Sequence, residues 1–330
     1  MRNILMMGVA LSLMAAPAFA QDWDNGGNDK KPITIDAFLA AAGAFNSGMV
    51  GFNKAHSANQ STSAYTTSSF DGSKGLMSQA QNAGANSSLQ NAISLAYVAN
   101  TNSSTLGIGA AVAGSENSGS VFGNRDTTGS AKPAPASDVY DPELIVGRVT
   151  QSGTINQSFN GSQGVMQSNQ NVGDNSLLQN ASAVASVTPT TGSAFQLGIA
   201  LAKSENEGTV GGNTAKNYYT TAASNVSNSF DNSKGVINLN QNSGANSELQ
   251  NSTAVATDTL KGASNATLAA SVALSSNHGG VWCNTATTAD GSNASNMSNS
   301  FNDSQGVIQA SQNAGANSLI QNTVSVGAVN

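Results

Sequence analysis

The sequence is poor in the residues on which most nucleic-acid-binding proteins and metalloproteins depend. Lys and Arg number 12 among 330 residues, charged residues make up 9%, and the formal net charge is −6. Because nucleic acid is bound by a basic face, this balance argues against a nucleic-acid partner. The two histidines, His56 and His278, have no carboxylate cluster or second metal ligand beside them in the sequence, so we expect surface residues. We therefore predict no metal ion and no other cofactor.

Catalytic groupings are also missing from the sequence. There is no Gly-x-Ser-x-Gly elbow, and no histidine is placed to activate a serine. Paired carboxylates for glycoside chemistry are not apparent. Asp71, Asp174, Asp231 and Asp303 occur near expected turns, but a calcium-binding repeat would place several acids close together, and the equivalent positions are often Asn or Gly. We predict that the protein is not an enzyme.

Cysteine occurs once, at Cys283, so an internal disulfide is excluded. In an oxidising compartment this thiol could join two chains. Free cysteine is usually a small buried residue, and we expect that role for Cys283 beside Trp282.

Apolar residues form one long run, and it lies at the N-terminus. Arg2 precedes an apolar stretch over residues 4–16, which is too short to span a bilayer. Ala18-Phe19-Ala20 then gives a small-x-small cleavage pattern, so residues 1–20 are predicted to be a secretory signal peptide. Residues 21–34 are polar and rich in Gly and Asn, and predict a disordered tail. No later segment is apolar enough to span a membrane, so the mature chain is expected to be secreted.

Repetition is the main positive feature of the sequence. A 23-residue segment occurs four times, with eleven positions identical in all copies. The copies read SFDGSKGLMSQAQNAGANSSLQN from Ser69, SFNGSQGVMQSNQNVGDNSLLQN from Ser158, SFDNSKGVINLNQNSGANSELQN from Ser229 and SFNDSQGVIQASQNAGANSLIQN from Ser300. The invariant residues are Ser, Phe, Gly, Gln and Asn, which include no acid or base. Repetition of this kind predicts a stacked or solenoidal architecture.

The segments between these copies also resemble one another, which divides the chain into four units. We place the units at residues 36–100, 101–190, 191–260 and 261–330. The second unit is longer because residues 125–150 form a proline-rich insertion, which we expect to be a surface loop.

Each copy is predicted to form a strand, a tight turn and a second strand, because Asn, Gly, Ser and Thr are poor helix formers and no helical periodicity is present. In the third copy, residues 235–241 form the first strand and residues 247–256 the second. Gly244 and Asn246 are expected to supply positive φ angles in the turn. Both faces of the second strand are mixed, and which one points inward stays open. Glu248 favours solvent on its own face.

Repeated amides can be buried if equivalent residues lie above one another at the strand spacing of ~4.8 Å, because each amide then bonds to the next. Such a row of equivalent residues is called a ladder below. The turn glycines are Gly84, Gly173, Gly244 and Gly315. The predicted ladders are Phe70, Phe159, Phe230 and Phe301; Gln81, Gln170, Gln241 and Gln312; Asn86, Asn175, Asn246 and Asn317; and Gln90, Gln179, Gln250 and Gln321.

These motifs resemble the repeats of bacterial functional amyloid subunits. The run QNSGANSELQ from Gln241 is similar to curli repeats, which carry Gln, Asn and a further Gln on one face with glycines in the turn. The string Gly-Val-x-x-x-Asn-Gln-Asn at Gly164 and Gly235 resembles repeats of Fap fibril subunits. The linkers are longer than in curli, and the C-terminal Cys-x-x-Cys of Fap subunits is absent. The resemblance implies an exported subunit that assembles outside an outer membrane into biofilm matrix.

The sequence therefore predicts an all-β repeat solenoid of stacked strand–turn–strand units, with two functional hypotheses. The first is a structural subunit that self-assembles into extracellular amyloid-like fibres. Its partners would be further copies of itself, a nucleator subunit and an outer-membrane secretion channel. The second is a monomeric β-solenoid adhesin that binds polysaccharide or host material, which requires the solenoid ends to be blocked.

Overall fold

The structure, a computed structural model, describes residues 35–57, 60–99, 106–129, 149–188, 195–259 and 266–329. The predicted signal peptide (1–20) and the predicted disordered tail (21–34) lie outside the described residues.

The described residues form twenty strands in four layers of five, and no helix occurs among them. The first layer contains β1 (Ile35–Gly51), β2 (Lys54–Ser57), β3 (Ser61–Thr67), β4 (Lys74–Asn82) and β5 (Ser88–Ala99). The second contains β6 (Leu106–Phe122), β7 (Arg125–Thr128), β8 (Val149–Asn156), β9 (Gln163–Asn171) and β10 (Leu177–Thr188). The third contains β11 (Phe195–Gly211), β12 (Thr214–Tyr218), β13 (Thr220–Ser227), β14 (Lys234–Asn242) and β15 (Glu248–Asp258). The fourth contains β16 (Ala266–Trp282), β17 (Thr285–Ala289), β18 (Ser292–Ser298), β19 (Gln305–Asn313) and β20 (Leu319–Val329).

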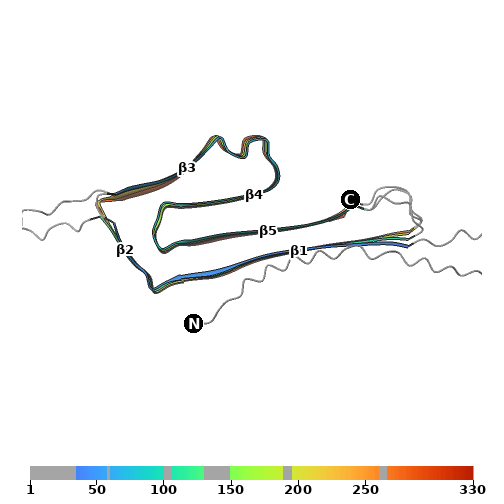
Figure 1. Cartoon of the computed structure of the whole chain (residues 1–330), viewed down its shortest axis with the longest axis horizontal. Helices are drawn as coiled ribbons and strands as arrows, with labels where there is room; N and C mark the ends of the chain where they lie inside the picture. The colour runs from blue at the N-terminus through green and yellow to red at the C-terminus, as the bar shows by residue number, and fades with distance from the viewer. Residues whose placement is uncertain are drawn as a thin grey trace, which may run out of the picture.

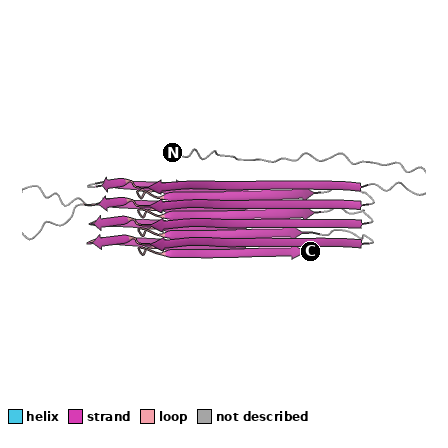
Figure 2. Cartoon of the chain, turned by 90° about the horizontal axis from the view of Figure 1, so that it is seen from below, coloured by secondary structure: helices cyan, strands magenta, loops and turns pink. Residues whose placement is uncertain are grey.

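The four layers follow one path and lie directly above one another, so that they superimpose in Figure 1 and appear as stacked layers of strands in Figure 2. Equivalent strands pair in parallel and form five four-stranded sheets, for example β1-β6-β11-β16 and β4-β9-β14-β19. The register places identical residues side by side, as in Gln170 opposite Gln81 and Gln241. The predicted all-β fold of stacked repeats is confirmed.

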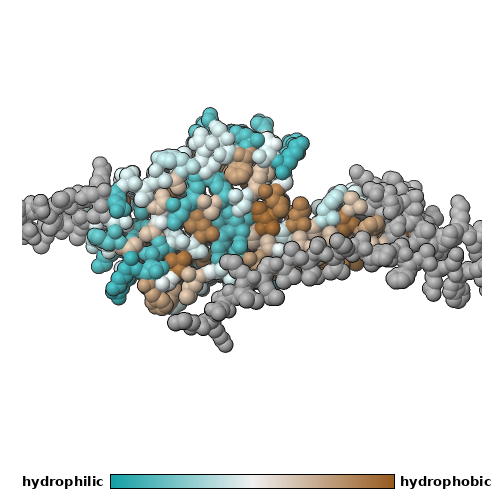
Figure 3. Space-filling view, viewed as in Figure 1, coloured by the Kyte–Doolittle hydropathy of each residue, from teal (hydrophilic) through white to brown (hydrophobic). Residues whose placement is uncertain are grey.

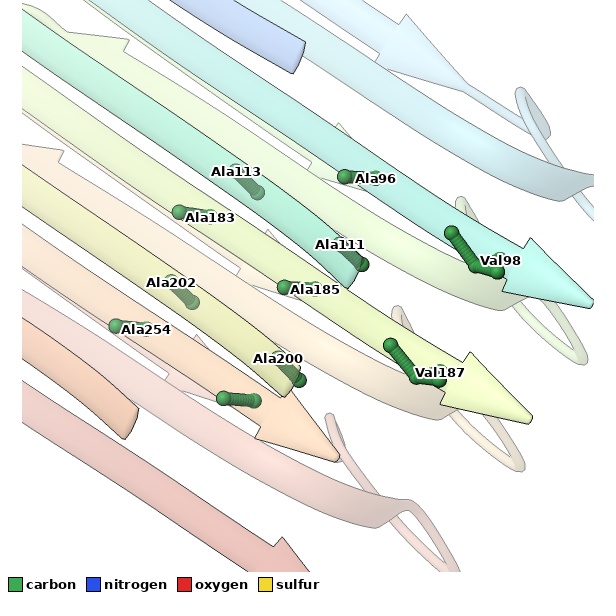
Figure 4. Close-up of a cluster of buried hydrophobic side chains, with 11 residues drawn as sticks. Ala96, Val98, Ala111, Ala113, Ala183, Ala185, Val187, Ala200, Ala202 and Ala254 are labelled. Atoms are coloured by element: carbon green, nitrogen blue, oxygen red, sulfur yellow. The ribbon is translucent and has the colours of Figure 1, made fainter. Parts of the chain in front are cut away.

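Small side chains fill the space between the sheet of first strands and the sheet of fifth strands. Ala111 and Ala200 from one sheet meet Ala185 and Ala256 from the other, and all four are buried (Figure 4). Alanine leaves little volume between facing backbones, which brings the two sheets close together. The abundance of Ala in these segments therefore follows from packing.

A second core lies between the third and fourth strands of each layer and contains larger side chains. Phe159 and Phe230 are fully buried there with Ile155, Val226 and Leu239. Because β14 packs between β13 on one side and β15 on the other, both of its faces are covered. This explains why the residues from Val236 to Asn242 are all buried instead of alternating with solvent.

The turn between β14 and β15 lies where the sequence predicts it, but Gly244 and Asn246 have different roles in it. Asn246 has a φ of 55°, as expected. Gly244 is not among the residues with positive φ, and its role is steric: a Cβ at this position would lie 1.7 Å from the carbonyl oxygen of Gly315 in the next layer. Glycine is required because the backbones of adjacent turns touch.

Three other expectations differ from the structure. Glu248 is fully buried, because it is stacked between Leu177 and Leu319 of the adjacent layers and its side chain lies against Gly208 and Gly279 of the first strands. Cys283 is exposed, since it occupies a corner after β16 with a φ of 49°. The ends of the proposed insertion 125–150 belong to β7 and β8, where pairing with neighbouring layers extends the strands.

Candidate functional site: the stacked ladders and the open layer edges

The four signature phenylalanines form a continuous aromatic ladder. Neighbouring ring centroids are 4.7 to 4.9 Å apart, and the rings are inclined to each other by no more than 12°. Each phenylalanine has a φ of 62° to 65°, a conformation that is unusual for a bulky residue. The backbone at Phe159 is held in this conformation by hydrogen bonds to adjacent layers, such as Phe159 N to Ser69 O at 2.8 Å. Hydrogen bonds to the adjacent layers thus stabilise a backbone conformation at phenylalanine that would be strained in a single layer.

The Gln90 ladder is continuous through all four layers. Gln179 Nε2 donates to Gln90 Oε1 at 2.7 Å, and Gln250 Nε2 donates to Gln179 Oε1 at 2.8 Å. Gln321 Nε2 donates to Gln250 Oε1, also at 2.8 Å. In each of these three pairs, the glutamine nearer the fourth layer is the donor. All three hydrogen bonds of the ladder therefore point toward the first layer, which gives the ladder a direction.

The Gln81 ladder has the same arrangement but is interrupted in the middle. Gln170 donates to Gln81 and Gln312 donates to Gln241, each at 3.3 Å. Between these pairs, Gln241 Nε2 bonds to the carbonyl oxygen of Asn296 at 2.9 Å, and Gln170 Oε1 accepts from Ser224 Oγ at 2.9 Å. Gln81, Gln170 and Gln241 are buried, and groups of the third strands complete the hydrogen bonding of Gln170 and Gln241.

The Asn86 set lies in register but forms no amide ladder in the described structure. Asn175 Nδ2 and Asn246 Nδ2 bond to the carbonyl oxygens of Thr214 and Thr285 at 3.3 and 2.9 Å. All four residues have φ between 51° and 55°, a left-handed conformation that Asn adopts more readily than most residues. The role of Asn at these positions is therefore to form the turn.

Two complete asparagine ladders were not selected from the sequence. In the first, Asn171, Asn242 and Asn313 each donate at 2.8 Å to the equivalent asparagine of the preceding layer, and the ladder begins at Asn82 in the first layer. In the second, Asn46, Asn117 and Asn206 donate in the opposite sense, toward the fourth layer, ending at Asn277. Both sets are invariant in the four repeats, so sequence comparison between repeats could have found them.

Acidic side chains are also buried in the stack, at positions outside the ladders. Asp174 is fully buried, and its pKa is raised well above the usual value by loss of hydration and by the nearby Asp126. Burial raises the pKa of Glu248 to about 8, although its carboxylate accepts hydrogen bonds from Gln250 Nε2 and Gly280 N. Burial also raises the pKa of Asp258 to about 6. Burial therefore favours the protonated, uncharged form of these three carboxyl groups.

A further cluster lies on the outer face of the sheet of first strands. His278 Nδ1 is 3.7 Å from Glu205 Oε1, and Glu207 is directly opposite His278 in the register. Lys203 Nζ lies 2.6 Å from Glu205 Oε2 and lowers the pKa of this carboxyl. His278 is exposed, as predicted, but the fold brings Glu205 and Glu207 beside it, which its neighbours in the sequence did not indicate.

Between the fourth and fifth strands, an apolar groove crosses all four layers. Figure 3, which looks along the stack, shows hydrophobic residues in brown between β4 and β5 at the near end. The walls of the groove include Leu76, Val165 and Val236 on one side and Leu95 and Val184 on the other. The groove follows the stacking direction because equivalent residues repeat in each layer.

The layers at the two ends of the stack have unpaired edges. In all five sheets, the strands of the first and fourth layers are the outermost ones in the described structure. Such edges present backbone N–H and C=O groups to a further strand. The described residues contain no helix long and apolar enough to cross a membrane.

Continuous amide and aromatic ladders, parallel in-register strands and open end layers define a β-solenoid of the amyloid-like class. Residues 130–329 match the family model of the functional amyloid protein FapB/FapC family. The chain belongs to this family of structural amyloid proteins, which confirms the resemblance drawn from the repeats. No curated protein and no solved structure matches the chain.

Proposed function

We propose that this protein is an exported subunit that adds head to tail to other copies of itself and forms extracellular fibres of the biofilm matrix. The observation that carries this proposal is the match between the two open end layers. The first layer of a second copy would meet the fourth layer of the first copy with the same residues that already stack inside the chain.

The Gln90 ladder illustrates this match. Within the chain, each glutamine after the first donates to the side-chain oxygen of the glutamine in the preceding layer. At the end of the stack, Gln321 Oε1 would accept from Gln90 Nε2 of the incoming copy. Phe301 and Phe70 would stack in the same way, at the spacing of the internal pairs. The junction between two chains would then resemble the junction between two layers.

Family membership supports the remaining parts of the proposal. Export from the cell through an outer-membrane channel and initiation by a nucleator subunit are proposed on this basis. A stack with two open edges also benefits from a partner that starts growth, because the first strand pairing between chains carries the largest entropic cost.

A glycine at the end of the stack provides the test. A Cβ at Gly315 would meet nothing closer than 3.4 Å in the isolated chain, whereas the same atom at Gly244 lies 1.7 Å from the next carbonyl oxygen. In a fibre, Gly315 would face Gly84 of the next copy. The variant G315A should therefore fold normally as a single chain and fail to extend.

The measurement is seeded assembly of residues 21–330 diluted from denaturant. Wild-type protein should form sedimentable fibres after a lag that sonicated seeds remove, and G315A should elongate at least roughly tenfold more slowly, since a backbone clash costs more than 1.4 kcal/mol. A Gly114→Ala variant is the control, because this position has open space and lies away from the junction. Wild-type protein that stays β-rich, soluble and monomeric would contradict the proposal and favour the adhesin.

A further inference from the structure

The outer face of the sheet of first strands brings together nitrogen and oxygen donors from two layers. Glu205 and Glu207 belong to β11 and His278 belongs to β16. One ligating atom from each of the three residues lies within 4.8 Å of the others. Two ligands of one tetrahedral Zn²⁺ stand about 3.3 Å apart when each bond is about 2.0–2.1 Å, so the 3.7 Å between His278 Nδ1 and Glu205 Oε1 requires only a small adjustment.

The charge of this region suits a divalent cation. Glu116 lies opposite Glu205 in the adjacent strand β6 and, with Glu207, acts electrostatically on Lys203. Three carboxylates against one ammonium leave a local charge of 1 − 3 = −2 when His278 is neutral. Lys203 already places a cation against Glu205, which shows that the carboxylates attract positive charge from that side.

The donors are accessible from solvent. The side chain of His278 is 68% exposed, whereas that of Glu205 is 15% exposed and so is held by its surroundings. A groove lined by Ser118, Ser120 and Glu207 adjoins the cluster and provides a path of entry. The site thus combines a positioned carboxylate with an imidazole that is free to turn toward an ion.

We propose that Glu205, Glu207 and His278 bind one divalent transition-metal ion of the zinc class per chain, with water completing the coordination. An imidazole with two carboxylates suits Zn²⁺ or Cu²⁺, whereas Mg²⁺ and Ca²⁺ prefer oxygen ligands alone. The ion displaces Lys203 from Glu205 and joins the third layer to the fourth. All donors belong to one chain, so the site does not depend on fibre formation.

The test is equilibrium dialysis of the folded chain, soluble or assembled, against ZnCl₂ with excess Mg²⁺. Wild-type protein should bind one Zn²⁺ per chain, and H278A should weaken binding at least roughly tenfold, since one of three protein ligands is lost. H56A is the matched control, because it removes the other histidine, which lies on β2 of the first layer, whereas His278 lies on β16 of the fourth. K203Q should bind Zn²⁺ more tightly, because it removes the competing ammonium.

Each result decides the proposal. One Zn²⁺ per chain that is weakened by H278A, retained by H56A and strengthened by K203Q supports the site. Failure of wild-type protein to bind Zn²⁺, or equal binding by wild type and H278A, overturns it. Weaker binding by K203Q would also overturn it, because Lys203 would then be part of the site instead of a competitor. Circular dichroism of every variant establishes that the β-rich fold is retained.

Discussion

Asp126 and Asp174 face each other inside the second layer at positions where the other three layers have alanine. Asp126 pairs with Ala55 and Ala215 in the register, and Asp174 replaces the alanine of the turn sequence. Thr128 Oγ1 donates to Asp126 at 2.9 Å and lies 3.4 Å from Asp174, and both carboxyl groups are buried. Loss of hydration and the nearby Asp126 raise the pKa of Asp174, because ionisation of this carboxyl would place a charge in a dry site next to another acid.

The double variant D126A/D174A should therefore be more stable than wild-type protein, most of all at alkaline pH. The folded pKa of Asp174 is raised, so its stabilising contribution is present below its unfolded pKa and is lost as the pH rises through the folded pKa. Guanidinium unfolding at a series of pH values checks this. A double variant with the same pH dependence as wild-type protein would show that the pair does not titrate in the stack.

Glu248 predicts a second pH effect in a different range. Its pKa is about 8 in the folded state against an ordinary value of 4.5, so the stability it contributes falls as the pH rises through about 8. The variant E248L introduces the residue that Leu177 and Leu319 supply in adjacent layers, and it should remove this loss. The measurement is the denaturation midpoint at about pH 6 and about pH 9, on either side of that pKa.

Asp71→Asn is the matched control for E248L. Asp71 is exposed, and Asn occupies the equivalent position in the second and fourth layers. This variant removes a carboxylate without changing a buried charge, so its pH profile should follow that of wild-type protein. Equal profiles for E248L and Asp71→Asn would contradict a buried, protonated Glu248.

Gly244→Ala should prevent the native stacking of the third and fourth layers. The added Cβ would lie 1.7 Å from the carbonyl oxygen of Gly315. The Cβ is bonded directly to the backbone of one turn and the oxygen belongs to the backbone of the other, so neither atom can move without shifting a turn. We expect a loss of several kcal/mol, comparable with severe overpacking. The denaturation midpoint and the far-UV circular dichroism spectrum measure this loss. Unchanged stability would mean that the turns are further apart than described.

The two kinds of buried amide should respond differently to substitution. Gln250→Leu removes a rung of a continuous ladder and leaves the buried side-chain oxygen of Gln179 without its donor, at a cost of about 1–3 kcal/mol. Asn246→Gly keeps the left-handed turn and should change stability little. Equilibrium unfolding compares them. Equal costs for both variants would contradict the distinction between ladder and turn residues.

Repetition made the fold accessible from the sequence. The stacked β architecture and the strand–turn–strand unit of the third copy follow from the repeats of Gln, Asn and Gly, because equivalent residues must lie above one another in a solenoid. The phenylalanine rings and the glutamines at positions 90, 179, 250 and 321 are brought together in the structure.

Side-chain direction was harder to predict because the inner strands are covered on both sides. Alternation with solvent identifies a face only when one side is wet, and β14 and β15 have neighbouring strands on both. The residues near Glu248 in the sequence therefore do not indicate that its side chain is buried. By contrast, Glu207 and His278 are 71 residues apart, which is the spacing of the third and fourth units. Alignment of the repeats could therefore have predicted that these two residues lie side by side.

The segment between β7, which ends at Thr128, and β8, which begins at Val149, is longer than the equivalent segment of the other three layers, so it occurs once in every four layers. In a fibre of stacked copies, layers about 4.8 Å apart would place the ends of these β7 strands in a straight row with an interval of about 19 Å. The same interval would separate every other feature that occurs once per chain, including Glu248 and the exposed Cys283. A fibre built in this way would be a molecular ruler, because the number of layers in each chain sets the spacing of whatever is displayed along its side.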